Sequence, residues 1–220
     1  MNIREIAGRL AKKEGHEFEK ILAGKLRYNV DGRPTTKVDI FGEHKMSVKN
    51  PSGKNTQISL STQKKFIRAF NLEGKCVTFV NEFFGGNNYI KFDRHRKKWF
   101  EIDEDVRSDF LTFLNSHPLE LFKFIFTHGF EMEDYVNIFA WALSKNNVDS
   151  VIFLDLEKVK EDFSKGVWSA NDTTLEFRID GKKILHIQMK GSGKKYTNGY
   201  HGIMIHVHGN FKESWETNIN

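Results

Sequence analysis

Residues 35–49, which read TTKVDIFGEHKMSVK, decide the fold. Their composition predicts one strand over 37–41 and a second over 45–49, because the Gly-Glu-His between them is typical of a turn. Asp39 lies in the first strand between two apolar residues. A carboxylate is seldom found in such surroundings unless it has a partner or a function. Lys49 ends the second strand, so a tight hairpin would bring Lys49 and Asp39 close together.

The sequence around this hairpin predicts a mixed α/β fold. Apolar residues recur at helical spacing from Ile3 to Leu26, with an interruption near Gly15 that indicates two helices. A third strand is expected after the hairpin, and the three would form a β-meander, followed by a helix capped at Ser61-Thr62 and a buried strand. The ranges expected for these last three elements are 56–60, 62–72 and 76–80.

The middle third of the chain has helical patterns, and the last third returns to strands. We therefore expect an α/β fold in which helices flank a mixed central β-sheet, as one domain over 1–220 with a helical insertion at about 100–145. Asp180-Gly181 predicts a hairpin turn. The helices are expected at 103–114, 118–126, 132–143 and 157–163, and the strands at 151–154, 174–179, 183–190 and 202–208.

Composition narrows the possible partners and compartments. The formal net charge of +5 favours an acidic partner such as nucleic acid. The single Cys76 excludes an internal disulfide, which suits a reducing environment. The N-terminal sequence lacks the apolar core of a signal peptide, and no run of about 18 apolar residues occurs. We therefore expect a cytoplasmic protein that does not enter a membrane.

The hairpin carries the residue types that phosphodiester cleavage requires. A carboxylate such as Asp39 binds a hard divalent cation, usually Mg²⁺, through oxygen, and the carbonyl of Val48 is available as a further ligand. A cation such as the ammonium of Lys49 positions the attacking water or lowers its pKa. The simplest alternative is a surface hairpin in which Asp39 only pairs with Lys37 or Lys49, a contact that contributes at most about 1 kcal/mol.

The hairpin and the order of elements resemble the PD-(D/E)xK nuclease superfamily, which includes many type II restriction endonucleases and Holliday-junction and repair nucleases. The resemblance implies that Asp39 is the first acid and Lys49 the lysine of the motif. Ser47 stands where a second acid is usual, so the remaining carboxylate must come from elsewhere. The segment GHEFEK at 15–20 resembles the Gly-x-x-Phe-Glu signature of these nucleases, which makes Glu19 the first choice, and Glu43, in the turn, ranks behind it.

The resemblance further implies a Mg²⁺-dependent, sequence-specific endonuclease that cuts double-stranded DNA. A homodimer would suit palindromic sites, and a cognate DNA methyltransferase is implied as a partner. Two alternatives stay open: a non-catalytic DNA-binding protein, with Ser47 as the sign of lost chemistry, and a repair or junction nuclease of the same fold.

A second segment favours DNA contact. Residues 187–195 read IQMKGSGKK, a Gly-rich and Lys-rich turn that can approach phosphates, while Gln and Lys reach base edges. His206 and His208 share a strand face, so a zinc site is the alternative for them, although no Cys ligand is near. The residues expected to contact DNA are Lys54, Asn55, Gln57, Gln188, Lys190, Ser192, Lys194, Lys195 and His208.

Overall fold

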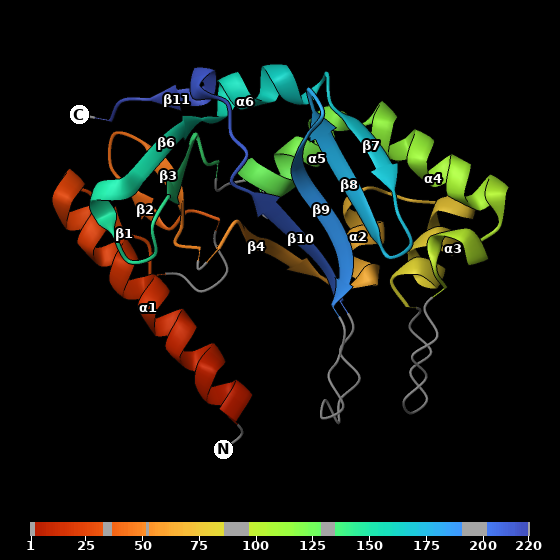
Figure 1. Ribbon diagram of the computed structural model, residues 1–220, viewed down its shortest axis with the longest axis horizontal. Helices are drawn as coiled ribbons and strands as arrows, with labels where there is room; N and C mark the ends of the chain where they lie inside the picture. Colours follow the sequence, from red (N-terminus) through yellow and green to blue (C-terminus); the bar gives the residue numbers. More distant parts are fainter. Residues whose placement is uncertain are drawn as a thin grey trace. The chain divides into compact units, whose positions relative to one another are not determined.

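In the computed structural model, residues 3–32, 37–51, 53–85, 97–128, 135–190 and 202–219 are described. The chain is mixed α/β, with six α-helices and two β-sheets in these ranges (Figure 1). Its residues group into two compact units. The first unit comprises Met1–Thr56, Phe126–Glu161 and Phe211–Asn220, and the second comprises Gln57–Ile125 and Asp162–Asn210.

The first unit contains a six-stranded mixed sheet in the order β1-β2-β3-β5-β6-β11. Strands β3 and β5 pair in parallel, and all other neighbours in this sheet are antiparallel. Strand β5 is buried at all five positions, as expected for a central strand. The elements are α1 (Ile3–Leu26), β1 (Asn29–Val30), β2 (Ile40–Phe41), β3 (Lys45–Lys49), β5 (Ile138–Ala142), β6 (Val151–Asp155) and β11 (Glu216–Thr217).

Helix α1 packs on this sheet through a short apolar stripe. Phe18, Leu22 and Ala23 are buried in one cluster with Ile40 of β2 and Met46 of β3. Phe18 and Leu22 are four residues apart and lie on one helix face, with Ala23 next to Leu22 in sequence, so their burial fixes the orientation of the helix on the hairpin.

The prediction of two helices over residues 3–26 is wrong, because α1 runs unbroken through Gly15. A glycine inside a helix costs only about 1 kcal/mol relative to alanine. The packing of the last turns of α1 on the sheet offsets such a cost.

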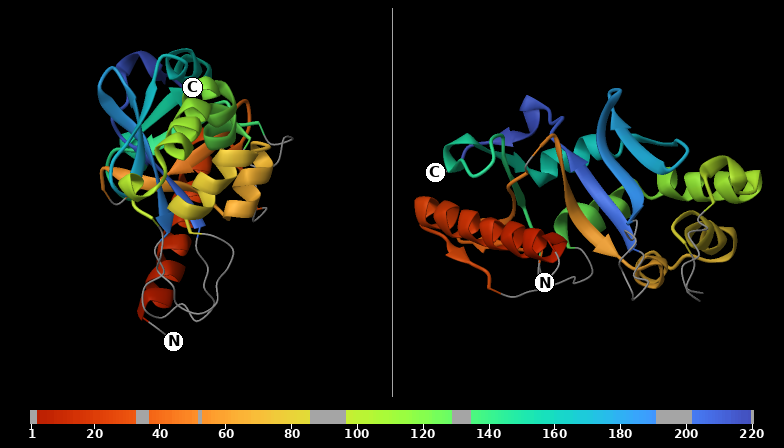
Figure 2. Two further views of the ribbon diagram at one scale, coloured as in Figure 1. Left: turned by 90° about the vertical axis from the view of Figure 1, so that its right-hand side faces the viewer. Right: turned by 60° about the horizontal axis from the view of Figure 1, so that its bottom comes forward.

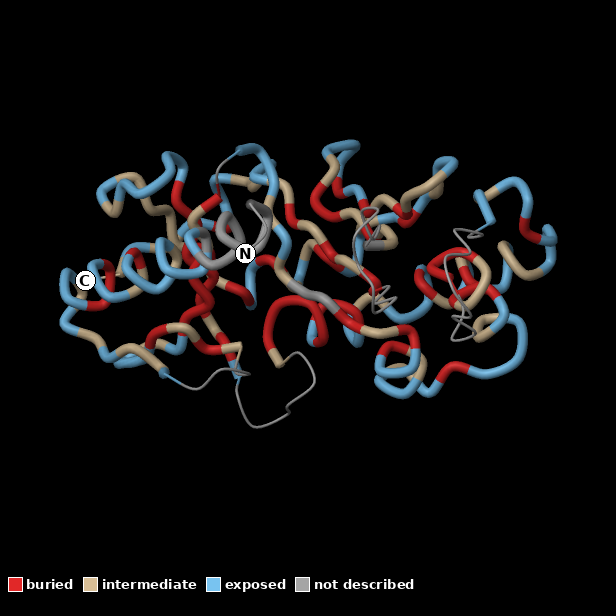
Figure 3. Tube along the Cα trace, turned by 90° about the horizontal axis from the view of Figure 1, so that it is seen from below, coloured by how far each residue is buried: buried red, intermediate tan, exposed pale blue. Residues whose placement is uncertain are grey.

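The second unit contains a five-stranded sheet in the order β4-β10-β9-β8-β7, with helices on one of its faces (Figures 1 and 2). Ile203, Ile205 and Val207 of this sheet are buried, whereas the turn at Asp180 and Gly181 is exposed, and Figure 3 maps burial along the whole trace. Helix α6 (Leu156–Phe163) spans the boundary between the units. The strands are β4 (Asn55–Ser61), β7 (Val167–Ala170), β8 (Thr174–Ile179), β9 (Lys182–Lys190) and β10 (Gly202–His208), and the helices are α2 (Gln63–Ala69), α3 (Gly74–Phe83), α4 (Glu104–Ser116) and α5 (Pro118–Phe122), followed by a π-helical turn at Lys123–Thr127.

Several local predictions for the second unit are confirmed. The side chain of Thr62 accepts a hydrogen bond from Lys65 N at 3.2 Å and caps α2. The turn between β8 and β9 has positive φ values of 49° at Asp180 and 76° at Gly181, as a two-residue hairpin turn requires. The strand predicted at 202–208 coincides with β10, and those at 174–179 and 183–190 match β8 and β9 within one residue.

Three other predictions are wrong. Residues 76–80 belong to helix α3, where Phe79, Val80 and Phe83 form a buried face at helical spacing. Residues 138–142 of the helix predicted at 132–143 form strand β5, because an unbroken apolar run does not distinguish a buried strand from a buried helix. The predicted β-meander is also absent from the described sheets, because β3 pairs with β5 and β4 belongs to the other sheet.

No helix among the described residues is both long enough and apolar enough to cross a membrane.

Candidate active site

The hairpin of β2 and β3 brings Asp39 and Lys49 together. The backbone N–H of Asp39, just before β2, donates to the carbonyl of Met46 at 2.8 Å, which extends the ladder and places Asp39 opposite Ser47. Strand alternation then puts Ser47 and Lys49 on the same face as the Asp39 carboxylate. The Nζ atom of Lys49 lies 3.0 Å from Oδ2 of Asp39, so the predicted proximity of these two side chains is confirmed.

Three donors of the same strand converge on Oδ2 of Asp39. Besides the Lys49 ammonium, the backbone N–H of Val48 donates at 2.6 Å and the hydroxyl of Ser47 at 3.2 Å. The side chains of Asp39 and Lys49 are 21% and 19% exposed. Hydrogen bonds to a charged, partly desolvated acceptor are stronger than neutral ones. Ser47, at the position of the expected second acid, therefore serves to hold the first.

The ammonium of Lys49 contacts two oxygens that were predicted to bind a metal ion. Its Nζ donates to the Val48 carbonyl at 2.7 Å as well as to Asp39 Oδ2, so it lies between two oxygens proposed as Mg²⁺ ligands. Carboxylate and carbonyl oxygens are the ligands that hard cations prefer. This oxygen pair thus accepts a positive charge, and a divalent cation bound to both oxygens would take the place of the ammonium.

Helix α1 places a second carboxylate within electrostatic range of Asp39. Burial of Phe18 in the core holds the next residue, Glu19, with its side chain 14% exposed and 3.0 Å from Nδ1 of His16. Burial raises the pKa of Glu19, and the charge of Asp39 raises it further, while His16 and Lys49 oppose the shift. Two carboxylates within electrostatic range of each other, one of them desolvated, form a site that a cation would stabilise.

The alternatives to Glu19 lie in different surroundings. Glu17, two residues earlier on α1, is exposed, as expected for the opposite side of the helix. Glu43 is exposed in the hairpin turn, where the Gly42 N–H donates to the His44 carbonyl at 3.0 Å. Glu19 is thus the partly buried acid of these three, and burial together with the charge of Asp39 raises its pKa.

Sequence reasoning missed a second lysine of the site. Lys37 stands two residues before Asp39, and its pKa is lowered to about 7, first by burial and then by the charge of Lys49, while Asp39 opposes the shift. From the sequence, Lys37 was expected only as a possible surface partner of Asp39. Its spacing of two from Asp39 was the available signal, since alternating residues of an extended segment share a face.

The residues predicted to contact DNA are divided between the two units. Lys54 and Asn55 are exposed in the first unit and Gln57 in the second. Gln188 and His208 are half-buried on β9 and β10 of the second unit. Lys190 ends β9, and Ser192, Lys194 and Lys195 lie outside the described residues.

The described residues contain no group of three or more His, Cys, Asp or Glu side chains arranged to hold a metal ion. This finding gives no support to the zinc alternative for His206 and His208. In the hairpin site, the candidate ligands are two carboxylates, of Asp39 and Glu19, and the carbonyl of Val48. All three offer oxygen, which fits Mg²⁺ better than a softer metal.

A scan of the sequence against protein-family models and a search of the curated proteins both find no match.

Proposed function

We propose that the protein is a Mg²⁺-dependent, sequence-specific endonuclease that hydrolyses phosphodiester bonds in double-stranded DNA, as type II restriction enzymes do. The observation that carries this proposal is the convergence of the Lys49 ammonium on Asp39 Oδ2 at 3.0 Å and on the Val48 carbonyl at 2.7 Å. A plain surface ion pair would need neither the backbone carbonyl nor a second, desolvated acid beside it.

The residues of the chain have distinct parts in this reaction. Asp39, Glu19 and the Val48 carbonyl would hold Mg²⁺, which polarises the scissile phosphate and lowers the pKa of the attacking water. Ser47 and the Val48 N–H hold Oδ2 of Asp39, so the carboxylate stays fixed as charge moves in the site. Lys49, released from the Val48 carbonyl, positions the attacking water and stabilises the charge that develops on the phosphate.

The remaining expectations belong to this proposal. DNA contacts would come from Gln57 and Gln188 together with the lysines predicted from the sequence. Cleavage of palindromic sites would suit a homodimer and would require a methyltransferase that protects the host DNA in the cytoplasm.

A cleavage assay on supercoiled plasmid tests the proposal directly. We expect discrete fragments with Mg²⁺, none with EDTA, and none for Asp39→Asn or Lys49→Met. Lys45→Met is the matched control, because Lys45 is an exposed lysine on the same strand, and this variant should cleave normally. Full cleavage by Lys49→Met, or no cleavage by the unaltered chain on DNA rich in different sequences, contradicts the proposal. A smear, or a preference for branched DNA, would instead indicate a nonspecific or junction nuclease.

One observation favours a second candidate function, a DNA-binding protein without catalysis. Ser47 stands where an acid is usual, is 1% exposed and donates to Asp39, so the hairpin itself carries a single carboxylate at this site. A mobility shift of duplex DNA without any Mg²⁺-dependent cleavage would decide for this alternative.

A further inference from the structure

One face of the sheet in the second unit carries a row of polar side chains. In β8, β9 and β10, alternate residues such as Leu175, Ile187 and Ile205 are fully buried, whereas their neighbours on the other face are only partly buried. The register places Glu176 opposite His186, and His186 opposite His206, so the three side chains cross the sheet in one line.

Three imidazoles on this face contact one another. The rings of His186 and His206 stack with centroids 4.6 Å apart and an interplanar angle of 8°. His186 Nδ1 lies 2.7 Å from His208 Nε2, and the Gln188 amide lies 3.4 Å from His206 Nε2. Nδ1 of His206 is buried without a hydrogen-bond partner. A buried polar atom left unsatisfied in this way marks a place where a further ligand would be stabilising.

Burial, reinforced at His186 and His208 by neighbouring charges, lowers the pKa of these imidazoles. Glu176 on β8 accepts hydrogen bonds from Lys183 on β9 at 2.8 Å and from Arg178 on β8 at 2.7 Å, so its charge is already compensated. Burial lowers the pKa of His186 to about 4, and His206, His208 and Lys183 add to the shift, against Glu176. The pKa of His206 and of His208 is lowered by burial as well.

We propose that the imidazole patch, formed by His186, His206, His208 and Gln188, contacts the phosphate backbone of DNA, and that this contact takes up protons, so that DNA binds more tightly as the pH falls. Charge complementarity supports DNA as the occupant, because Lys183 and Arg178 flank the patch and together outweigh the negative charge of Glu176, which faces the imidazoles. A phosphate at the patch would oppose the effect of burial on the imidazoles. A nearby anion raises the pKa of an imidazole, because it favours the protonated form. The inference rests on the proposed function, because it takes DNA as the ligand.

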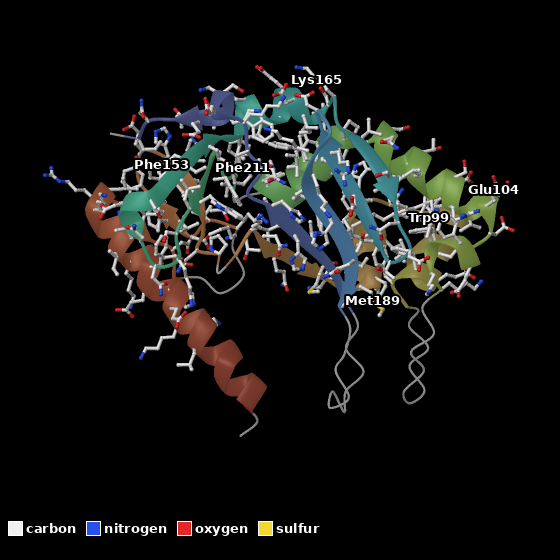
Figure 4. The ribbon with its side chains drawn as sticks, viewed as in Figure 1. Trp99, Glu104, Phe153, Lys165, Met189 and Phe211 are labelled. Carbon is white, nitrogen blue, oxygen red and sulfur yellow. The ribbon has the colours of Figure 1, made fainter. Side chains whose placement is uncertain are left out.

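The physical basis of the pH dependence is linkage between proton and DNA binding. If the bound complex holds one more proton than the free chain, the affinity rises about tenfold for each unit by which the pH falls, over the range between the two pKa values. Hydrogen bonds from lysine or arginine to phosphate carry no such dependence near neutral pH, because those groups stay protonated. Lys37 is an exception, because its pKa is lowered to about 7, so the imidazole patch is distinguished by the loss of the pH dependence when its histidines are replaced. In Figure 4, the label of Met189 marks the end of β9 and so the position of the neighbouring Gln188, a member of the imidazole patch.

The test is fluorescence anisotropy of a labelled duplex at constant ionic strength between pH 5.5 and 8.5, with the Asp39→Asn chain so that DNA stays intact. We expect the affinity to increase three- to tenfold per pH unit on acidification. The double variant His186→Gln/His208→Gln should lose this dependence while keeping most of its affinity at pH 8.5. His117→Gln is the control, because His117 is an exposed histidine of the same unit, between α4 and α5, and this variant should keep the dependence.

The outcomes separate this inference from the proposed function. The inference is overturned if binding is independent of pH, or if the double variant, shown by its thermal unfolding to be folded, keeps the full dependence. Mg²⁺-dependent cleavage by the unaltered chain would leave the proposed function standing in either case. Binding to no duplex at any pH overturns both. Inorganic phosphate serves as the second ligand: proton uptake with phosphate equal to that with DNA would assign the patch to small anions and overturn the DNA contact.

Discussion

Replacement of Glu19 by glutamine should separate two effects of this carboxylate: it destabilises the folded chain without Mg²⁺, and it stabilises the folded chain when it binds Mg²⁺. Its side chain is 14% exposed and lies within range of the Asp39 charge, so the folded chain bears the cost of a desolvated anion beside another. Glutamine keeps the shape and removes that cost, while the contact with half-exposed His16 that is lost contributes less than about 1 kcal/mol. Without divalent cations, Glu19→Gln should therefore be more stable than the unaltered chain, by about 0.5–2 kcal/mol.

Magnesium should reverse this order. A ligand at a hundredfold excess over its dissociation constant stabilises the folded state by about 2.7 kcal/mol, and the variant would gain much less because one ligand is gone. The assay is urea unfolding at pH 7.5 with EDTA and with a Mg²⁺ series. Glu17→Gln, an exposed position two residues away, should change neither curve. The reasoning is refuted if Glu19→Gln is less stable than the unaltered chain in EDTA, or if both gain equally from Mg²⁺.

Further substitutions test single contacts. Ser47→Ala removes one donor to the Asp39 carboxylate and should lower the free energy of unfolding by about 1 kcal/mol in urea, with a several-fold loss of the proposed cleavage; an unchanged unfolding midpoint would show that the contact does not stabilise the fold. Gly166→Ala would place a Cβ 2.1 Å from the fully buried Phe177 ring and should cost about 1–3 kcal/mol, whereas Gly15→Ala meets nothing within 4 Å and should raise the melting temperature. For His186, the pKa of about 4 lies below the usual 6.5, so the folded chain binds the proton more weakly than the unfolded chain. Stability should be complete above about pH 6.5 and decrease as the pH falls towards 4, and His186→Gln should reduce this loss in unfolding curves taken between those values.

The sequence predicted best what depends on neighbours along the chain. The hairpin that joins Asp39 to Lys49 spans few residues, and its turn and alternation are local signals. Glu19 was predicted from the resemblance of its segment to the Gly-x-x-Phe-Glu signature, and its pKa is raised by burial and by the charge of Asp39. The contribution of Lys37 could not be found in this way, because its pKa depends on how deeply the folded chain buries it.

The errors came from contacts between distant parts of the chain. Strand β5 pairs with β3 across about ninety residues, and its unbroken apolar run fits either a helix or a strand until that neighbour is known. Helix α3 has β-type residues, and its helical form follows from a buried face at residues 79, 80 and 83 that packs within its own unit. Tertiary context decided the local structure in both cases.

The parallel pairing of β3 with β5 also affects how the protein matures during synthesis. The hairpin with Asp39 and Lys49 is complete once residue 49 has left the ribosome, but the backbone groups on the far edge of β3 wait for residues 138–142. The sheet is completed only when β11, at residues 216–217, pairs with β6. A chain that stopped after residue 125 would therefore present Lys49 on a strand with an open edge, prone to pair with other chains. The sheet around Asp39 and Lys49 is thus fully assembled only after residues 216–217 have been synthesised, long after the hairpin itself.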